Sequence, residues 1–365
     1  VEIEQPARVK IRKIMLDIMD EQMSKCLKVR IQYASNYARV SNYWKYFIGQ
    51  SEQLVNNKVS DKKQNIESSF TSWYQKNKLE NEYGQALNLI KNATESSSKY
   101  IIPKVYFQEA VFGSEIILFM FRNLGKRAPL YNALKTGEGV SIAKEALLQK
   151  AESYFKDYNA TIDENTLASI LSLYANDVSK EFQPELLLSL NEKYKGNFKK
   201  FASNYFSKTP FKSYELFKEW LNNDKLSLKA IEKDVVFQLM NQFLAVYRAK
   251  VMLPKSKFDS DYKKGMRLFV DALQKMGMNK SSDANSTMRF TYGNVLSYKP
   301  ADAVNYDFFT TLEGVMQKEV VTNDKNHEFY VPQKLKDLYE AKDYGPYARK
   351  EDGKLPVGFL SNNDI

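Results

Sequence analysis

The apolar residues of this 365-residue chain change their spacing near residue 279. Before that point they recur every three or four positions, the period of a helix buried on one face. After it they alternate with polar residues, the period of a strand. A polar stretch lies between the two patterns, Asn279-Lys280-Ser281-Ser282-Asp283-Ala284-Asn285. We therefore predict a mainly α fold with two domains, an α-helical domain over residues 1–282 and an incomplete antiparallel β segment over residues 283–365.

A stripe of large side chains marks one helix of the first domain. Between Arg8 and Gln50, five large residues recur at spacings of four and three, which places them on one face. They are Tyr33, Tyr37, Val40, Trp44 and Phe47. We expect this face to pack against the core.

Asn42 lies about 180° from the centre of that stripe, counting 100° per residue. It shares its face with Ser35, Ala38, Arg39 and Tyr46. Spacing alone predicts solvent exposure there. Small and polar groups behind a rigid aromatic stripe are also typical of a cleft wall, so the pattern leaves both interpretations open.

Capping signals predict where further helices begin and end. The predicted starts are Ser60, the capping-box pair Thr161 and Glu164, Thr209-Pro210, and Asp259 or Ser260; Gly277 is predicted to end the last of these helices. The apolar stretch Val111–Phe121 predicts a buried central helix, because a membrane span needs about 20 residues.

Beyond the polar stretch, the sequence predicts short strands. Met288, Phe290 and Tyr292 alternate with polar residues before a turn at Gly293-Asn294, which predicts a hairpin returning through Val295–Tyr298. Further strands are predicted at Phe308-Phe309, Gly314–Met316, Glu319–Val321 and Leu355–Leu360, with a helix at Gln333–Glu340. So few strands make a partial sheet.

The two ends suggest an excised piece of a longer protein. The first residue is Val1, and the strand-like run Leu355–Leu360 is followed closely by the last residue, Ile365. Natural termini usually trail off in polar residues. We therefore expect the missing strands to come from a parent chain.

Composition narrows the classes of partner and site. The net charge of +10 could indicate an acidic partner or nucleic acid, but 44 of the 54 basic residues are Lys and ten are Arg, whereas Arg is favoured for reading bases and phosphates. A self-sufficient helical module that binds an acidic protein or peptide stays an alternative. With one cysteine, Cys26, and one histidine, His327, the sequence predicts no disulfide, no metal site and no cofactor.

No catalytic constellation is evident in the sequence. His327 lies in a polar turn without an apolar wall, so we predict a solvated loop residue. Gly137 and Gly139 follow no strand, and a turn is predicted there. Glu109 and Glu115 could be paired carboxylates, but without metal-binding histidines they are predicted to be buried or cleft-edge residues with hydrogen-bonding partners.

Several short motifs resemble the bacterial dipeptidyl-peptidase 7 and 11 family. The motifs are Arg30-Ile31-Gln32-Tyr33-Ala34-Ser35, Asn42-Tyr43-Trp44-Lys45, Asp283-Ala284-Asn285-Ser286-Thr287, Arg289 with Tyr292-Gly293, Phe359-Leu360 and Asn363-Asp364-Ile365. Residues 60–280 match in length and helical character but carry no motif. The resemblance implies an exported serine exopeptidase of a Gram-negative bacterium, periplasmic or at the cell surface, that removes dipeptides from peptide N-termini.

In that family a large helical domain caps the cleft of a chymotrypsin-like double β-barrel. The resemblance implies that this chain is the helical cap and the start of the second barrel, that it ends before the nucleophile loop, and that it contains no catalytic residue. A fragment of that kind is predicted to be inactive. Asn42 matches a substrate-binding asparagine that accepts a hydrogen bond from the substrate's free amino group.

The same resemblance implies the partners. They are an oligopeptide with a free N-terminus and the missing barrel segments of the parent chain; nucleic acid and a membrane span are not expected, and a homodimer is left open. The residue that selects acidic or hydrophobic side chains follows the nucleophile in the family, so substrate preference is not readable here.

Overall fold

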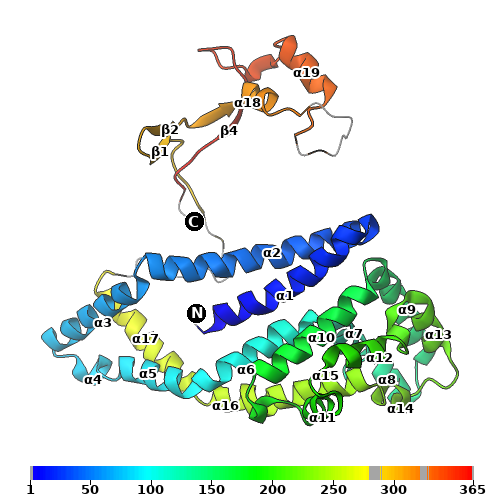
Figure 1. Ribbon diagram of the computed structural model, residues 1–365. Helices are drawn as coiled ribbons and strands as arrows, with labels where there is room; N and C mark the ends of the chain where they lie inside the picture. Colours follow the sequence, from blue (N-terminus) through cyan, green and yellow to red (C-terminus); the bar gives the residue numbers. More distant parts are fainter. Residues whose placement is uncertain (1–2, 279–287, 289, 321–326, 328, 364–365) are drawn as a thin grey trace. The chain divides into compact units, whose positions relative to one another are not determined.

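The computed structural model describes residues 3–278, 288, 290–320, 327 and 329–363. The chain divides into two compact units, Val1–Lys280 and Ser281–Ile365. The first unit is helical and the second contains short strands and helices (Figure 1). The predicted mainly α fold is confirmed.

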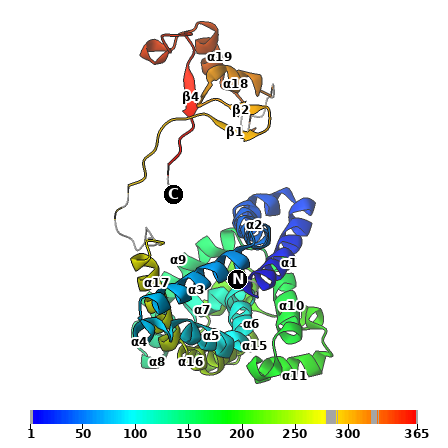
Figure 2. The same cartoon turned by 90° about the vertical axis from the view of Figure 1, so that its left-hand side faces the viewer.

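Helices of very different length build the first unit (Figure 1 and Figure 2). The α-helices are α1 (Glu4–Lys25), α2 (Leu27–Asn56), α3 (Val59–Lys76), α4 (Glu80–Tyr83), α5 (Ala86–Ser97), α6 (Ile101–Val105), α7 (Glu115–Asn123), α8 (Pro129–Thr136), α9 (Val140–Lys156), α10 (Ala160–Asp177), α11 (Glu185–Tyr194), α12 (Phe198–Phe206), α13 (Tyr214–Asn222), α14 (Leu228–Glu232), α15 (Val235–Val246), α16 (Leu253–Ser256) and α17 (Asp259–Lys275). Short 3₁₀ and π turns join them: η1 (Ser98–Tyr100), η2 (Tyr106–Ala110), η3 (Val111–Gly113), η4 (Lys180–Phe182), η5 (Pro210–Lys212) and η6 (Tyr247–Met252).

The long helices α1 and α2 lie side by side and are joined through Cys26, whose backbone is extended (Figure 1). The predicted stripe of α2 faces inward, as expected. Its residues Tyr33, Val40 and Phe47 are buried, and Tyr37 and Trp44 are partly buried against the cluster that α1 and α2 share with α10.

The predicted central helix is buried but broken in two. Val111 ends up in the 3₁₀ turn η3, and α7 begins only after Ser114, whose backbone is extended. Asp163 of α10 accepts hydrogen bonds from the first backbone N–H groups of α7, so a carboxylate from another helix caps this break. A local apolar pattern carries no signal for such a distant cap.

Helices α3, α4, α5 and α17 enclose a smaller cluster around Phe70, Tyr83 and Ala272. Helix α17 begins at Asp259, and Gly277 follows it with a φ of +72°, as predicted. Backbones approach closely here, because a Cβ added at Gly265 would lie 2.7 Å from the carbonyl oxygen of Ala86 on α5.

Three predicted helix starts need correction. Helix α3 begins at Val59, one residue before the predicted cap Ser60. The side chain of Asn159, not the Thr161 pair, caps α10. Thr209 caps the 3₁₀ turn η5, and α13 begins after Ser213, whose side chain caps it. In the last two cases an oxygen-bearing side chain close to the predicted cap takes the free N–H group.

The described residues of the second unit form two separate two-stranded antiparallel sheets. Its elements are β1 (Tyr298–Ala301), β2 (Val304–Tyr306), β3 (Phe309–Thr311), α18 (Leu312–Gln317), α19 (Gln333–Glu340), η7 (Gly345–Tyr347) and β4 (Pro356–Phe359). Strand β1 pairs with β2, and β3 pairs with β4. The predicted helix at Gln333–Glu340 is confirmed. Strand β4 lies within the predicted run Leu355–Leu360, and of the predicted pair Phe308-Phe309, Phe309 is in a strand and Phe308 is not. The predicted strand at Gly314–Met316 is helical. Glu319 and Val320 are not in a strand, and Val321 lies outside the described residues.

The predicted hairpin around Gly293-Asn294 is wrong. Residues 290–294 form no strand, and Val295 makes an isolated antiparallel bridge to Ser361. A Cβ added at Gly293 would lie 2.7 Å from the backbone nitrogen of Asn363. Glycine is therefore needed there because two distant segments approach closely, not because the chain turns.

Many apolar side chains of the second unit are exposed. Met288, Phe290, Tyr292 and Phe359 are between 71% and 86% exposed. Within the described part of the chain, no helix is long and apolar enough to cross a membrane.

Candidate functional site

Helix α2 presents Asn42 on its outward face. Asn42 is exposed, as are Ser35, Arg39 and Tyr46 on the same face. No hydrogen bond ties the Asn42 side chain to another residue of the described segments. Its amide is therefore available to a ligand, on a helix whose opposite face is packed.

Helix α2 is held against α1 by a cation and two aromatic rings. The guanidinium group of Arg12 on α1 lies 5.3 Å from the Tyr43 ring and 5.4 Å from the Phe47 ring. The same group donates to Glu109 at 2.6 Å. Glu109 is therefore paired with Arg12 and not with Glu115, so the two predicted carboxylates do not form a pair.

A polar pocket lies beside α2, about one helical turn N-terminal to Asn42. Its volume is about 310 Å³, and its lining residues are Gln32, Tyr33, Ser35, Asn36, Arg39, Glu115 and Asp157. The Tyr33 hydroxyl donates to Glu115 Oε1 at 2.8 Å and accepts from the backbone N–H of Asn159 at 3.0 Å. Tyr33 thus ties α2 to both α7 and the start of α10.

Behind this pocket, Asp163 is fully buried and collects four donors. They are the hydroxyl groups of Ser114 (2.9 Å) and Tyr158 (3.1 Å) and the backbone N–H groups of Glu115 (2.8 Å) and Ile116 (2.7 Å). Burial raises the pKa of Asp163, and these hydrogen bonds oppose that effect. Four donors favour the ionised form of Asp163.

The neighbouring acid, Glu115, is perturbed more strongly. Burial, and then the negative charge of Asp163, raise the pKa of Glu115 to about 8, while the Tyr33 hydrogen bond and the Arg39 charge act in the opposite direction. The sequence marked Glu115 as a buried or cleft-edge residue with a partner, which is confirmed. The sequence analysis did not identify Tyr33 or Asp163 as partners of Glu115. Tyr33 belongs to the packed stripe of its helix, and an acid in the first turn of a helix, such as Asp163, is an ordinary feature.

The remaining predicted residues form no site. His327 is exposed and its Nδ1 accepts from the backbone N–H of Phe329 at 3.1 Å. Gly137 and Gly139 have positive φ at the turn between α8 and α9, as predicted. Among the described residues, no group of three or more His, Cys, Asp or Glu side chains could hold a metal ion.

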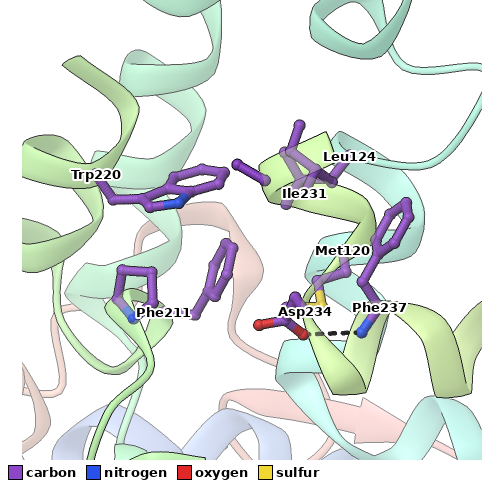
Figure 3. Close-up of a pocket in the computed structure, with 9 residues that line it drawn as sticks. Met120, Leu124, Phe211, Trp220, Ile231, Asp234 and Phe237 are labelled. Carbon is purple, nitrogen blue, oxygen red and sulfur yellow. Dashed lines mark hydrogen bonds between the residues drawn. The ribbon is translucent and has the colours of Figure 1, made fainter. Parts of the chain in front are cut away.

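A small cavity in the helical core is a packing gap. Its volume is about 40 Å³, and its wall is mostly apolar, with Phe211, Trp220 and Phe237 around Asp234 (Figure 3). The Asp234 carboxylate accepts the backbone N–H groups of Val236 and Phe237, both at 2.9 Å, and so caps α15. Asp234 therefore has a structural role as a helix cap.

Comparisons with known proteins agree with the resemblance. The chain is 34% identical over 361 residues to an Asp/Glu-specific dipeptidyl-peptidase of Flavobacterium psychrophilum, covering 98% of this chain and 49% of that protein. It is 36% identical over 369 residues to a dipeptidyl-peptidase 7 of Phocaeicola vulgatus, with the same coverage of each chain. It thus spans about half the length of these relatives.

A solved structure shares the fold. The crystal structure of Porphyromonas endodontalis DPP11 in complex with substrate matches with a TM-score of 0.77 at 26% identity, covering 99% of this chain and 50% of that one. The family model described as Peptidase S46 matches residues 1–365. The chain therefore belongs to the peptidase S46 family.

Proposed function

We propose that this chain is the helical cap and a partial barrel segment of a serine dipeptidyl peptidase that removes dipeptides from peptide N-termini. The observation that carries the proposal is the Peptidase S46 match over all 365 residues. The names of the relatives support it, and a solved relative has been crystallised with the dipeptide Arg-Glu.

Asn42 is the proposed contact to the substrate's free amino group. Its amide oxygen can accept one ammonium hydrogen bond. Its exposure on α2, together with the buried stripe on the opposite face, supports a rigidly held, outward-pointing acceptor. Rigid placement lowers the entropic cost of binding.

The catalytic residues are proposed to lie elsewhere in the whole protein. A serine nucleophile needs a positioned base, and the sequence offers one imidazole, His327. That side chain is exposed and accepts a backbone N–H group. We therefore expect the 365-residue chain alone to be inactive.

The exposed apolar side chains of the second unit are proposed to pack against other barrel segments of the parent. A groove of about 610 Å³ is lined by Val295, Phe308, Phe309, Val357 and Phe359, among others. Apolar patches of this kind mark surfaces that another segment covers. By family resemblance we also propose export to the periplasm or cell surface, which fractionation of the native cells would test.

Substitution of Asn42 in the whole enzyme tests the site. Asn42→Ala should lower kcat/KM for peptides with a free N-terminus by roughly 10- to 150-fold, because a hydrogen bond to a charged group contributes about 1.5 to 3 kcal/mol. Its melting temperature should stay close to wild type. Asn65→Ala, at another exposed helix asparagine on α3, is the matched control. Wild-type kinetics for Asn42→Ala would remove Asn42 from the site.

A further inference from the structure

The polar pocket beside α2 contains a carboxyl group with an unused oxygen. Within the described residues, Tyr33 is the one hydrogen-bond donor to the side chain of Glu115, through Oε1. The second oxygen, Oε2, receives no donor there, although Glu115 lines the pocket. Partly buried carboxylates normally have their hydrogen-bonding capacity filled by protein, water or ligand.

The pocket carries charges of both signs. Asp157 and Arg39 both line the pocket, and both are close enough to change the pKa of Glu115. Arg39 is exposed and donates to Asn36 Oδ1 at 2.9 Å, so its guanidinium group has further donors to offer. Two acids and one guanidinium group therefore share one cavity.

Other ionisable groups near Glu115 belong to the wall behind it. Asp163 on α10 is saturated by its four donors, and Tyr154 and Tyr158 are kept neutral because burial raises the pKa of each hydroxyl group. These groups cannot balance the charge of an ionised Glu115. Arg39 offsets part of that charge, and a cation entering the pocket could offset the rest.

The charged side chains that line the pocket indicate which class of ligand fits it. A metal ion is disfavoured, because no metal-binding group of three ligands exists among the described residues. A simple anion would meet two acids against one Arg. A volume of about 310 Å³ lies at the lower end for small-molecule sites. A small molecule with both an ammonium and a carboxylate group uses all three charges.

We propose that this pocket binds a small zwitterionic amino compound, an α-amino acid or a dipeptide, with its ammonium group against Glu115 and Asp157 and its carboxylate against Arg39. Asn42 does not line this pocket, and the proposal does not depend on the proposed peptidase activity. Ammonium binding favours the ionised carboxylate, so binding should displace a proton from Glu115. Affinity should therefore rise with pH up to about 8, the value to which burial raises the pKa of Glu115.

Isothermal titration calorimetry of the 365-residue chain tests this. The probes are glycine and glycylglycine, with ethylamine and acetate as half-ligands. We expect one or both zwitterions to bind more tightly than either half-ligand, and the comparison of the two zwitterions identifies the preferred length. Glu115→Gln should weaken binding roughly 10- to 150-fold, because a hydrogen bond to a charged group is lost. It should also remove the pH dependence.

Two further variants keep the test decisive. Arg39→Gln, at an exposed position, should weaken zwitterion and acetate binding while leaving ethylamine binding unchanged. Lys45→Gln, an exposed cation of α2 outside the pocket, is the matched control and should bind as wild type. The proposal is overturned if neither zwitterion binds in the millimolar range, or if Glu115→Gln and Arg39→Gln both bind like wild type.

Discussion

At the scale of single residues, one buried aspartate organises the helical core. Asp163 accepts hydrogen bonds from two hydroxyl groups and two backbone N–H groups. The two N–H groups belong to the first turn of α7, so Asp163 on α10 caps that helix. In Asp163→Asn, the amide nitrogen must face a donor, which leaves at least one buried donor unsatisfied. We expect a loss of about 1 to 3 kcal/mol of unfolding free energy for each such donor, measured by urea denaturation. An unchanged unfolding midpoint would show that these bonds contribute nothing net.

Glu115 should make stability depend on pH. Its pKa is raised from 4.5 to about 8 in the folded protein, so the folded state binds more protons than the unfolded state between these values. Stability is therefore present in full at low pH within this window and falls as pH rises through it. Glu115→Gln should flatten the difference in unfolding free energy between about pH 5 and pH 9. Parallel pH profiles for wild type and variant would contradict this assignment.

At the scale of elements, the close approach of α5 and α17 depends on one glycine. The Cβ of Gly265→Ala would meet the Ala86 carbonyl oxygen at 2.7 Å, so the helices must separate. Overpacking of this kind costs about 1 to 3 kcal/mol. Gly49→Ala on α2 is the matched control, because its Cβ meets nothing within 4 Å. This variant should raise the unfolding free energy by about 0.5 to 1 kcal/mol, because alanine is more stable than glycine within a helix. Denaturant midpoints that shift in the same direction for both variants would refute the packing argument.

Elements set by local signals were predictable from the sequence. The helix Gln333–Glu340 has the predicted bounds, and the stripe of α2 faces inward, because both depend on periodicity and neighbouring residues. Elements set by distant contacts were not. The break at Ser114 depends on Asp163, and the path around Gly293 depends on Asn363. Neither contact leaves a local pattern.

The candidate site was predictable to a similar extent. The exposure of Asn42 followed from its position opposite the stripe. The polar pocket could not be predicted from the sequence, because Glu115 and Asp157 come from elements far from α2 in the sequence. Only the fold brings these charges together.

At the scale of the whole molecule, the chain belongs to the peptidase S46 family but covers only part of the length of its relatives. The chain matches Peptidase S46 over its full length, yet spans about half of its relatives. This combination motivates the central claim that the parent removes dipeptides and that the 365-residue chain contributes the cap, a partial barrel and the amino-group contact.

Product analysis by mass spectrometry tests this claim most directly. The whole protein and the 365-residue chain would each be incubated with one peptide in two forms, with a free and with an acetylated N-terminus. We predict that the whole protein releases dipeptides from the free form and nothing from the acetylated form, and that the chain alone releases nothing. Cleavage of the acetylated peptide, release of single amino acids, or dipeptide release by the chain alone would contradict the account.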